Sequence, residues 1–214
     1  MEPFVKQIRA GGDRNFAYLF GDDEVCAVVD PSYDEGGKVS REIEQTKLKL
    51  EWILITHGDP DHIYSAQKIS QNYGAQIAAH SSCKQPVHYW LNDGDEVTMG
   101  SLSIKAIYTP GHTIDSMCFL CGKWLFTGDT LFIGKVGGTD FGAGAKAEYD
   151  SLHYKLMRLP VDTIVYPGHD YGLKPVSTIG DEKKNNPFIQ CLSFDAFVDL
   201  KRNWQEYKRK HGIP

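Results

Sequence analysis

The sequence predicts a mixed fold of the α/β or α+β class, in which helices pack against β-sheets. Apolar runs of strand length recur between turn residues, and segments of helical character separate the later runs. The chain has 214 residues, of which 41% are hydrophobic, so a sizeable core can form. Because no internal repeat or low-complexity linker divides it, we expect a single domain over residues 1–214.

The expected strands are short, and the first two pair as a hairpin across Gly21-Asp22-Asp23. In chain order they are Phe16–Phe20, Val25–Asp30, Trp52–Thr56, Gln76–Ala79, Leu102–Tyr108, Met117–Leu120, Trp124–Thr127 and Thr163–Tyr166. Helices are expected at Lys38–Lys47, Ile63–Tyr73, Glu148–Leu159 and Phe194–Lys210. The glycine-dense segment 134–147 has neither GxGxxG nor a Walker pattern and predicts a mobile or tightly turned surface loop near a site.

Charge and composition exclude several functional classes. The net charge is −5 and no long basic run occurs, so we expect no nucleic-acid partner. The basic residues Lys201-Arg202 and Lys208-Arg209-Lys210 alternate with aromatic and acidic ones, which predicts the solvated face of the last helix. No apolar leader or membrane span is visible. We therefore expect a cytoplasmic protein with a small-molecule substrate and no membrane partner, and the sequence predicts no oligomeric state.

The cysteines do not indicate a disulfide framework, because there are five of them at irregular spacing. Cys118 and Cys121 form a CxxC inside SMCFLCGKWLF. A structural zinc ribbon needs a second such pair. We interpret the motif as a strand, a turn at Gly122-Lys123, and a second strand.

Potential metal ligands follow the ends of several predicted strands. The strand EWILIT leads directly into HGDPDH, which carries His57, Asp59, Asp61 and His62. A loop held between a strand and a helix places its side chains with little further ordering cost. Three more strands end in TPGH, TGD and YPGH, which add His112, Asp129 and His169.

Glycine precedes the ligand at each of those three strand ends, and it allows a sharp turn close to an ion. Four such strand ends with residue types suited to zinc or iron predict one metal site. The remaining histidines lack this context and are expected to be ordinary surface or core residues; they are His80, His88, His153 and His211.

The ordered motifs HGDPDH, TPGHT, FTGDTLF and YPGHDY resemble those of the metallo-β-lactamase-fold hydrolases. The resemblance is strongest to the branch that contains glyoxalase II and the persulfide dioxygenases, and it extends from about Asn15 to NNPF at 185–188. It implies an α+β fold, a four-layer αββα sandwich, with a dinuclear metal site at one edge of the two sheets.

The resemblance also implies a ligand set. His57, Asp59 and His112 would bind the first metal, Asp61, His62 and His169 the second, and Asp129 both. Asp61 and Asp129 are the carboxylates that we expect to be catalytic. The implied cofactors are two divalent ions, with zinc preferred and iron or manganese as alternatives.

Two metal ions that share a water lower its pKa and make it a nucleophile, while either ion polarises a carbonyl. The leading hypothesis is therefore a metal-dependent hydrolase, glyoxalase II-like, acting on a thioester or a related ester. The alternative is a non-haem iron oxygenase or oxidoreductase that acts on a small thiol or persulfide. A third hypothesis is a non-catalytic member of the fold.

Asp59 departs from the family pattern, which usually has histidine at this position. An anionic oxygen ligand there favours iron or manganese over zinc. Flavodiiron proteins resemble this chain in having a carboxylate, glutamate, at that place, but they also carry a flavodoxin domain. The other hypotheses are that Asp59 leaves one site weak, so that a single ion is used, or that it points away and caps the turn before the next helix.

A second departure concerns the substrate. Glutathione-using relatives commonly have Gly-Arg-Thr-Asp after the bridging aspartate, whereas this chain has Gly137-Gly138-Thr139-Asp140. Lys135 is the neighbouring cation, but it lacks the planar fork of arginine. The resemblance therefore does not decide whether glutathione is recognised.

Overall fold

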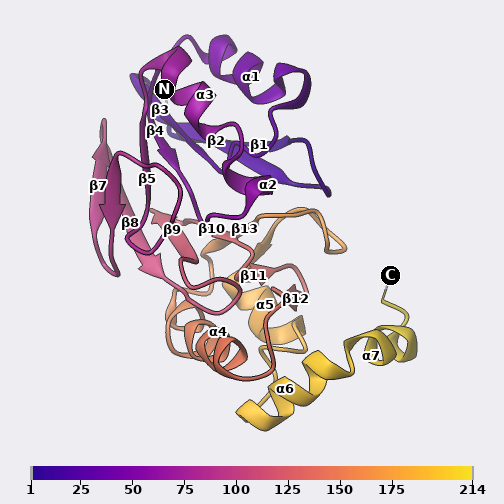
Figure 1. The fold of residues 1–214 in the computed structure, drawn as a ribbon. Helices are drawn as coiled ribbons and strands as arrows, with labels where there is room; N and C mark the ends of the chain where they lie inside the picture. Colours follow the sequence, from indigo (N-terminus) through magenta and orange to yellow (C-terminus); the bar gives the residue numbers. More distant parts are fainter. Residues whose placement is uncertain (1, 214) are drawn as a thin grey trace.

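Two six-stranded sheets lie face to face in the middle of the molecule, and helices cover the outer face of each sheet (Figure 1). The structure is a computed structural model that describes residues 2–213. The layers follow the order helix, sheet, sheet, helix, so the predicted four-layer αββα sandwich is confirmed. Within residues 2–213, none of the helices has the length and hydrophobicity that a bilayer crossing requires.

The first sheet begins as antiparallel hairpins and continues as parallel strands. Its strands, in spatial order, are β1 (Phe4–Arg9), β2 (Phe16–Gly21), β3 (Val25–Val29), β4 (Lys49–Leu54), β5 (Gln76–His80) and β6 (Tyr89–Leu91). Parallel neighbours need crossover connections, and helices supply them on the outer face. They are η1 (Glu35–Gly37) and α1 (Lys38–Thr46) before β4, then α2 (Pro60–Ile63) and α3 (Ala66–Tyr73) before β5.

The second sheet is antiparallel except for one parallel pair, β10 with β13. Its spatial order is β14 (Ser177–Thr178), β13 (Ile164–Pro167), β10 (Trp124–Gly128), β9 (Met117–Cys121), β8 (Leu102–Tyr108) and β7 (Glu96–Met99). The connection from β10 to β13 contains β11 (Leu131–Phe132), β12 (Lys135–Val136), α4 (Ala143–Tyr154) and η2 (Leu156–Arg158). The chain ends with α5 (Ile179–Asn185), α6 (Phe194–Arg202) and α7 (Trp204–His211).

Three apolar cores separate the four layers. Side chains alternate between the two faces of each strand, so Leu19 of β2 packs under α1 and α3 while Phe20 enters the core between the sheets. In β10, Leu125 likewise packs against the C-terminal helices and Phe126 faces the other sheet. Both sheets are therefore covered on both faces, which leaves only their edges for a site.

Most of the predicted elements are present, with shifted ends. The hairpin of β2 and β3 is confirmed, as is the strand–turn–strand interpretation of the CxxC, and all five cysteines are free. The predicted strand 102–108 coincides with β8. The predicted helix from Ile63 to Tyr73 is instead two helices, and the first begins at Pro60, where proline fits the first helical turn.

Three predictions for the second half of the chain are wrong in part. The glycine-dense segment 134–147 is not one loop, because it contains β12 and the start of α4. Lys201 does not lie on a solvated helix face: its side chain is 6% exposed and pairs with buried Glu148. The predicted last helix also breaks at Asn203, which changes the faces that α6 and α7 present.

The Asp22 carboxylate joins the turns of two hairpins at the edge opposite to the predicted site. It accepts hydrogen bonds from the amides of Glu24 and Val25 in the β2–β3 turn, at 2.9 and 3.0 Å. It also accepts from the amide and hydroxyl of Ser101, between β7 and β8, at 2.7 and 2.9 Å. These donors hold the pKa of Asp22 below its usual range.

We predict that Asp22→Asn lowers the free energy of unfolding at neutral pH, because an amide presents fewer acceptor sites than a carboxylate. Since the folded-state pKa is lowered, the stabilisation is complete above the unfolded pKa of about 3.9 and is lost as pH falls below it. Urea titrations at several pH values should therefore show a difference from wild type that shrinks below about pH 4. Asp162→Asn, which removes an exposed partner of Lys123, is the control. A difference independent of pH would contradict this role.

Candidate metal centre

The predicted ligands lie where the ends of β4, β8, β10 and β13 meet at one edge of the sandwich. The parallel pairing of β10 and β13 sets Gly128 beside Pro167, so Asp129 and His169 emerge next to each other. Two backbone contacts join the sheets at this edge. The Phe16 amide donates to Gly168 O at 2.8 Å, and the Met117 amide donates to Thr56 O at 2.8 Å.

All seven predicted residues come together here. They form three overlapping groups whose ligand atoms lie within 4.8 Å of one another, and each group has two histidines and one carboxylate. The groups are His57, Asp59 and His112; Asp61, His62 and His169; and His57, His62 and Asp129. Their role as metal ligands stays a prediction, whereas His80, His88, His153 and His211 belong to none of the groups found within residues 2–213.

Each of the four histidines is held through Nδ1. His62 Nδ1 donates to Asp30 Oδ2 at 2.8 Å, His112 Nδ1 to Gly138 O at 2.7 Å, and His169 Nδ1 to Asp13 O at 2.8 Å. The fourth, His57 Nδ1, lies 3.0 Å from the Thr56 hydroxyl, which itself donates to Asp30. These partners place the proton on Nδ1 and leave the Nε2 lone pairs for a metal.

The Asp129 carboxylate lies between the two outer groups. Its Oδ1 is 3.3 Å from His62 Nε2, and its Oδ2 is 3.4 Å from His169 Nε2 and 3.8 Å from His112 Nε2. Although burial opposes ionisation, the neighbouring His62 and His169 hold the pKa of Asp129 well below its usual range. Asp129 therefore has the reach and the ionisation state of a bridging ligand.

The unpartnered atoms of the site fit a divalent cation. His57 Nε2 and Asp129 Oδ1 are buried and have no hydrogen-bond partner among the described residues. His62 Nε2 and His169 Nε2 lie 3.2 Å apart, facing each other. Buried polar atoms without partners are costly, and two lone pairs that face each other repel. A cation bound to these nitrogens and oxygens removes both costs, so the donor set fits zinc, iron or manganese.

Asp59 turns toward the site. It stands at the N-terminus of α2, with extended backbone angles and Pro60 following, but its side chain makes no capping hydrogen bond. Its Oδ2 lies 3.4 Å from His112 Nε2 and 3.6 Å from His57 Nε2. The neighbouring His112 and His57 side chains hold the pKa of Asp59 well below its usual range. The hypothesis that Asp59 points away and caps the turn is therefore wrong.

Two further aspartates support the ligands, and the sequence analysis missed both. Asp30 is 2% exposed and accepts from the Thr56 amide at 2.8 Å, the Thr56 hydroxyl at 2.6 Å and His62 Nδ1. Asp115 accepts from the Gly58 amide at 2.9 Å and so fixes the loop between His57 and Asp59. Asp30 directly follows the apolar strand β3, as Asp129 directly follows β10, and this position at a strand end was the sequence signal for Asp30. No comparable sequence signal marks Asp115.

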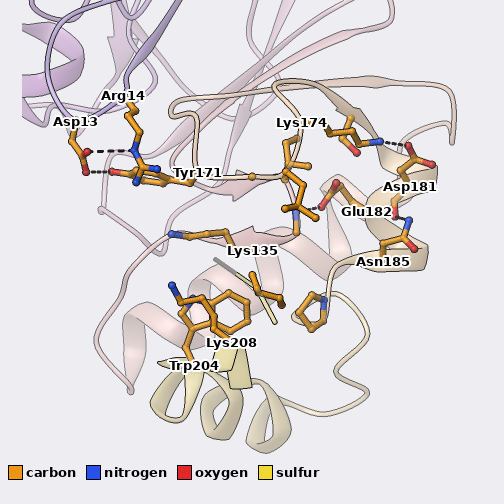
Figure 2. Close-up of a pocket in the computed structure, with 17 residues that line it drawn as sticks. Asp13, Arg14, Lys135, Tyr171, Lys174, Asp181, Glu182, Asn185, Trp204 and Lys208 are labelled. Carbon is orange, nitrogen blue, oxygen red and sulfur yellow. Dashed lines mark hydrogen bonds and ion pairs between the residues drawn. The ribbon is translucent and has the colours of Figure 1, made fainter. Parts of the chain in front are cut away.

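A pocket of about 870 Å³ opens beside the His169 end of the site (Figure 2). Two of its lining residues contact His169: the Tyr171 ring stacks on the imidazole at 4.6 Å, and Asp13 O accepts from Nδ1. The Lys135 ammonium lies 4.4 Å from the centre of the Tyr171 ring and 5.1 Å from that of Phe132. Burial lowers the pKa of Lys135, and no ion pair to it is found within residues 2–213. The pocket thus offers a cation next to the metal centre.

Comparisons with known proteins agree with this geometry. A family model described as the metallo-beta-lactamase superfamily matches residues 10–82 and 84–169. The persulfide dioxygenase ETHE1 of Homo sapiens is 33% identical, over 88% of this chain and 76% of that protein. The probable polyketide biosynthesis zinc-dependent hydrolase BaeB of Bacillus velezensis is 31% identical, over 93% and 90%. The crystal structure of ETHE1 from Myxococcus xanthus superposes with a TM-score of 0.87 at 32% identity, over 94% and 91% of the two chains.

We predict that Asp30→Asn weakens metal binding about tenfold to hundredfold, the usual effect of losing a partner behind a ligand. An asparagine has one carbonyl oxygen for the three donors that Asp30 accepts, and its amide group would face one of them. Chelator competition with zinc or cobalt measures the affinity. Asp22→Asn is the matched control, since it removes a similarly bonded carboxylate at the opposite edge. Wild-type affinity in Asp30→Asn would refute the support role.

The Asp59 position should set metal preference. Asp59→His replaces a hard anionic oxygen by a borderline nitrogen, so we expect a higher affinity for zinc relative to manganese and iron. In Asp59→Ala we expect the group of His57 and His112 to weaken while the group of Asp61, His62 and His169 keeps its ion. Metal stoichiometry and competition titrations on the three proteins test this. If all of them bind the same ions equally well, Asp59 is not a ligand.

Proposed function

Because this chain belongs to the metallo-beta-lactamase superfamily, we propose that it is a non-haem iron enzyme that oxidises the outer sulfur of a small persulfide with O₂. The observation that carries the proposal is the group of His57, Asp59 and His112. Two histidines and one carboxylate with open positions are typical of non-haem iron(II) oxygenases. The relatives named persulfide dioxygenase support this choice of substrate.

The charge of the site also favours iron. Asp59 and Asp129 both lie within reach of His112 Nε2, at 3.4 and 3.8 Å, so two carboxylates would balance one divalent ion. Harder oxygen ligands shift preference from zinc toward iron and manganese. A ferrous ion held there would supply the redox chemistry that O₂ needs to react with a closed-shell sulfur compound.

The residues around the pocket would bind and orient the substrate. Lys135 would pair with an anionic group of the persulfide, and its half-buried position strengthens such a pair. Tyr171 is fixed for this task, because its hydroxyl donates to Asp13 Oδ2 at 2.8 Å while its ring stacks on His169. The rings of Tyr171 and Phe132 shield the approach from water on the His169 side.

The net reaction balances without another cofactor. A persulfide, O₂ and water give a thiol, sulfite and two protons: the S–S bond breaks, the inner sulfur leaves as the thiol, and the outer sulfur gives four electrons to O₂ and gains its oxygen atoms from O₂ and water. The chain itself would have to bind the substrate anion, hold the ligand histidines in one tautomer and exclude bulk water.

A metal-dependent hydrolase of thioesters is the second candidate. Asp61, His62 and His169 form a complete further group, and Asp61 is held by hydrogen bonds from the Asn15 amide to its carbonyl and carboxylate oxygens, both 3.0 Å long. In this reaction Asp61 and Asp129 would be the catalytic carboxylates. The relative named as a zinc-dependent hydrolase supports this candidate.

We predict that protein reconstituted with Fe²⁺ consumes O₂ when given glutathione persulfide or cysteine persulfide, and forms sulfite in a one-to-one ratio. An oxygen electrode measures the O₂ consumed, and a sulfite assay measures the product formed. The same preparation, and protein loaded with zinc or manganese, is assayed with a panel of thioesters, lactones, lactams and phosphodiesters. Thioester turnover with zinc and no O₂ uptake with iron would overturn the proposal in favour of the hydrolase.

Lys135→Ala tests the proposed role of Lys135 in substrate binding with the same assay. Losing a charged contact of about 1.5–3 kcal/mol should raise KM about tenfold or more with little change in kcat. Lys123→Ala removes a lysine paired with Asp162 on the surface and is the matched control. An unchanged KM in Lys135→Ala would place the substrate anion elsewhere.

A further inference from the structure

A buried ion pair connects α6, the helix before the last, to the core behind the candidate metal centre. Glu148 of α4 is 0% exposed, and Lys201 of α6 is 6% exposed. The Lys201 ammonium donates to the Glu148 carboxylate. Burying two charges costs free energy that their attraction often does not fully recover, so a role beyond stability should be sought for this pair.

The pair lies directly behind His112. Gly111, with φ of +153°, packs so tightly on α4 that a Cβ there would come within 2.3 Å of Glu148 Cβ. Gly137 is equally confined, since its Cβ would lie 2.1 Å from Asp129 O and 3.1 Å from Glu148 Oε1. The backbone beside two candidate ligands, His112 and Asp129, therefore rests on Glu148.

Two hydrogen bonds, joined by the backbone between Gly137 and Gly138, connect the pair to the His112 ring. Lys201 Nζ donates to Gly137 O at 2.6 Å, and the next carbonyl, Gly138 O, accepts from His112 Nδ1 at 2.7 Å. Two successive glycines leave the backbone wide conformational freedom. The direction of Gly138 O, and with it the orientation of the imidazole, thus depends on what holds Gly137.

We propose that the Glu148–Lys201 pair is the positioning element for His112, and that it couples docking of α6 to metal binding by the group of His57, Asp59 and His112. Lys201 fixes the Gly137 carbonyl, Glu148 fixes Lys201 and supports Gly111, and together they aim His112 Nε2 at Asp59 and Asp129. The inference rests on His112 being a metal ligand and is independent of which reaction the centre performs.

If the Glu148–Lys201 pair only tethered α4 to α6, the expected results would be different. Loss of a tether would lower the stability of the whole protein and would weaken both metal groups together. Loss of a positioning element weakens the His112 group alone. The hydrogen bonds of Lys201 lead to Glu148 and to Gly137, on the His112 side of the site. Asp61, His62 and His169 therefore serve as the internal reference, with Asp129 common to both groups.

The decisive variants are Lys201→Met, which keeps the apolar stem, and the double variant Glu148→Gln/Lys201→Met, which leaves no uncompensated buried charge. Lys201→Arg keeps the cation and tests rescue. Val198→Ala is the matched control, because Val198 packs α6 against the same core without being part of the path to Gly137. Each variant is combined with His169→Ala, so that metal binding reports on the group of His57, Asp59 and His112. Each is also combined with Asp59→Ala, so that metal binding reports on the group of Asp61, His62 and His169.

Two readouts are measured for each variant. The first is the ¹⁵N–¹H resonance of His112 Nδ1–H in metal-free protein. We expect it to shift strongly or to vanish through solvent exchange in Lys201→Met and in the double variant, and to return in Lys201→Arg. The second is affinity for Co²⁺ and Zn²⁺ by chelator competition. It should fall about tenfold to hundredfold in the His112 group and stay unchanged in the other group.

Val198→Ala should lower the melting temperature and leave both readouts as in wild type. If the double variant keeps the His112 resonance and the affinity of its group, the proposal is overturned. Equal losses in both groups, in proportion to the fall in melting temperature, would overturn it as well. Failure of the persulfide assay would leave these results unaffected, since neither readout uses a substrate.

Discussion

The central constraint on this molecule is the cost of gathering three carboxylates and four imidazoles at one sheet edge. Like charges repel, and buried polar atoms need partners. Hydrogen-bond partners are present for only some of these buried atoms. Every candidate histidine has a hydrogen-bond partner at Nδ1, whereas His57 Nε2 and Asp129 Oδ1 have none among the described residues. Three apolar cores supply the stability that holds these groups in place, and a bound cation would supply the missing partners. The fold therefore holds the candidate ligands close together, and a bound cation would remove the cost of holding them there.

The strand ends and the candidate ligands that follow them could be predicted from the sequence. HGDPDH and the three glycine-preceded residues stand at ends of apolar strands, and strand ends meet at an edge, so the seven residues that the structure brings together could be named from the sequence, and their role as ligands stays a prediction. Asp30 was missed although it follows β3 in the same way, because no histidine or glycine accompanies it. Lys201 was misplaced because its burial depends on Glu148, 53 residues away, and periodicity within one helix carries no information about that partner.

Chemistry at this edge depends on small differences between ligands. Asp59 changes the donor set of one group to two histidines and a carboxylate, the same composition as the other two groups. Hydrolysis needs a Lewis acid, whereas oxidation by O₂ needs a redox-active ion, so under the proposed function the ion that is retained would set the type of reaction. In that proposal the cation of the neighbouring pocket, Lys135, would bind an anionic substrate in both cases. The ion and the pocket would then be separate determinants, one of reaction type and the other of substrate.

The proposed role of Glu148 and Lys201 links these two determinants. α6 continues after Asn203 into α7, and Trp204 and Lys208 of α7 line the pocket. Coupling between two binding events is reciprocal. Under the proposal, a metal bound by the His112 group therefore favours the docked position of α6, and a docked α6 brings the α7 wall of the pocket into place. The pocket would be complete when the metal centre is complete, so that a substrate bound there meets an ion already held in its working geometry.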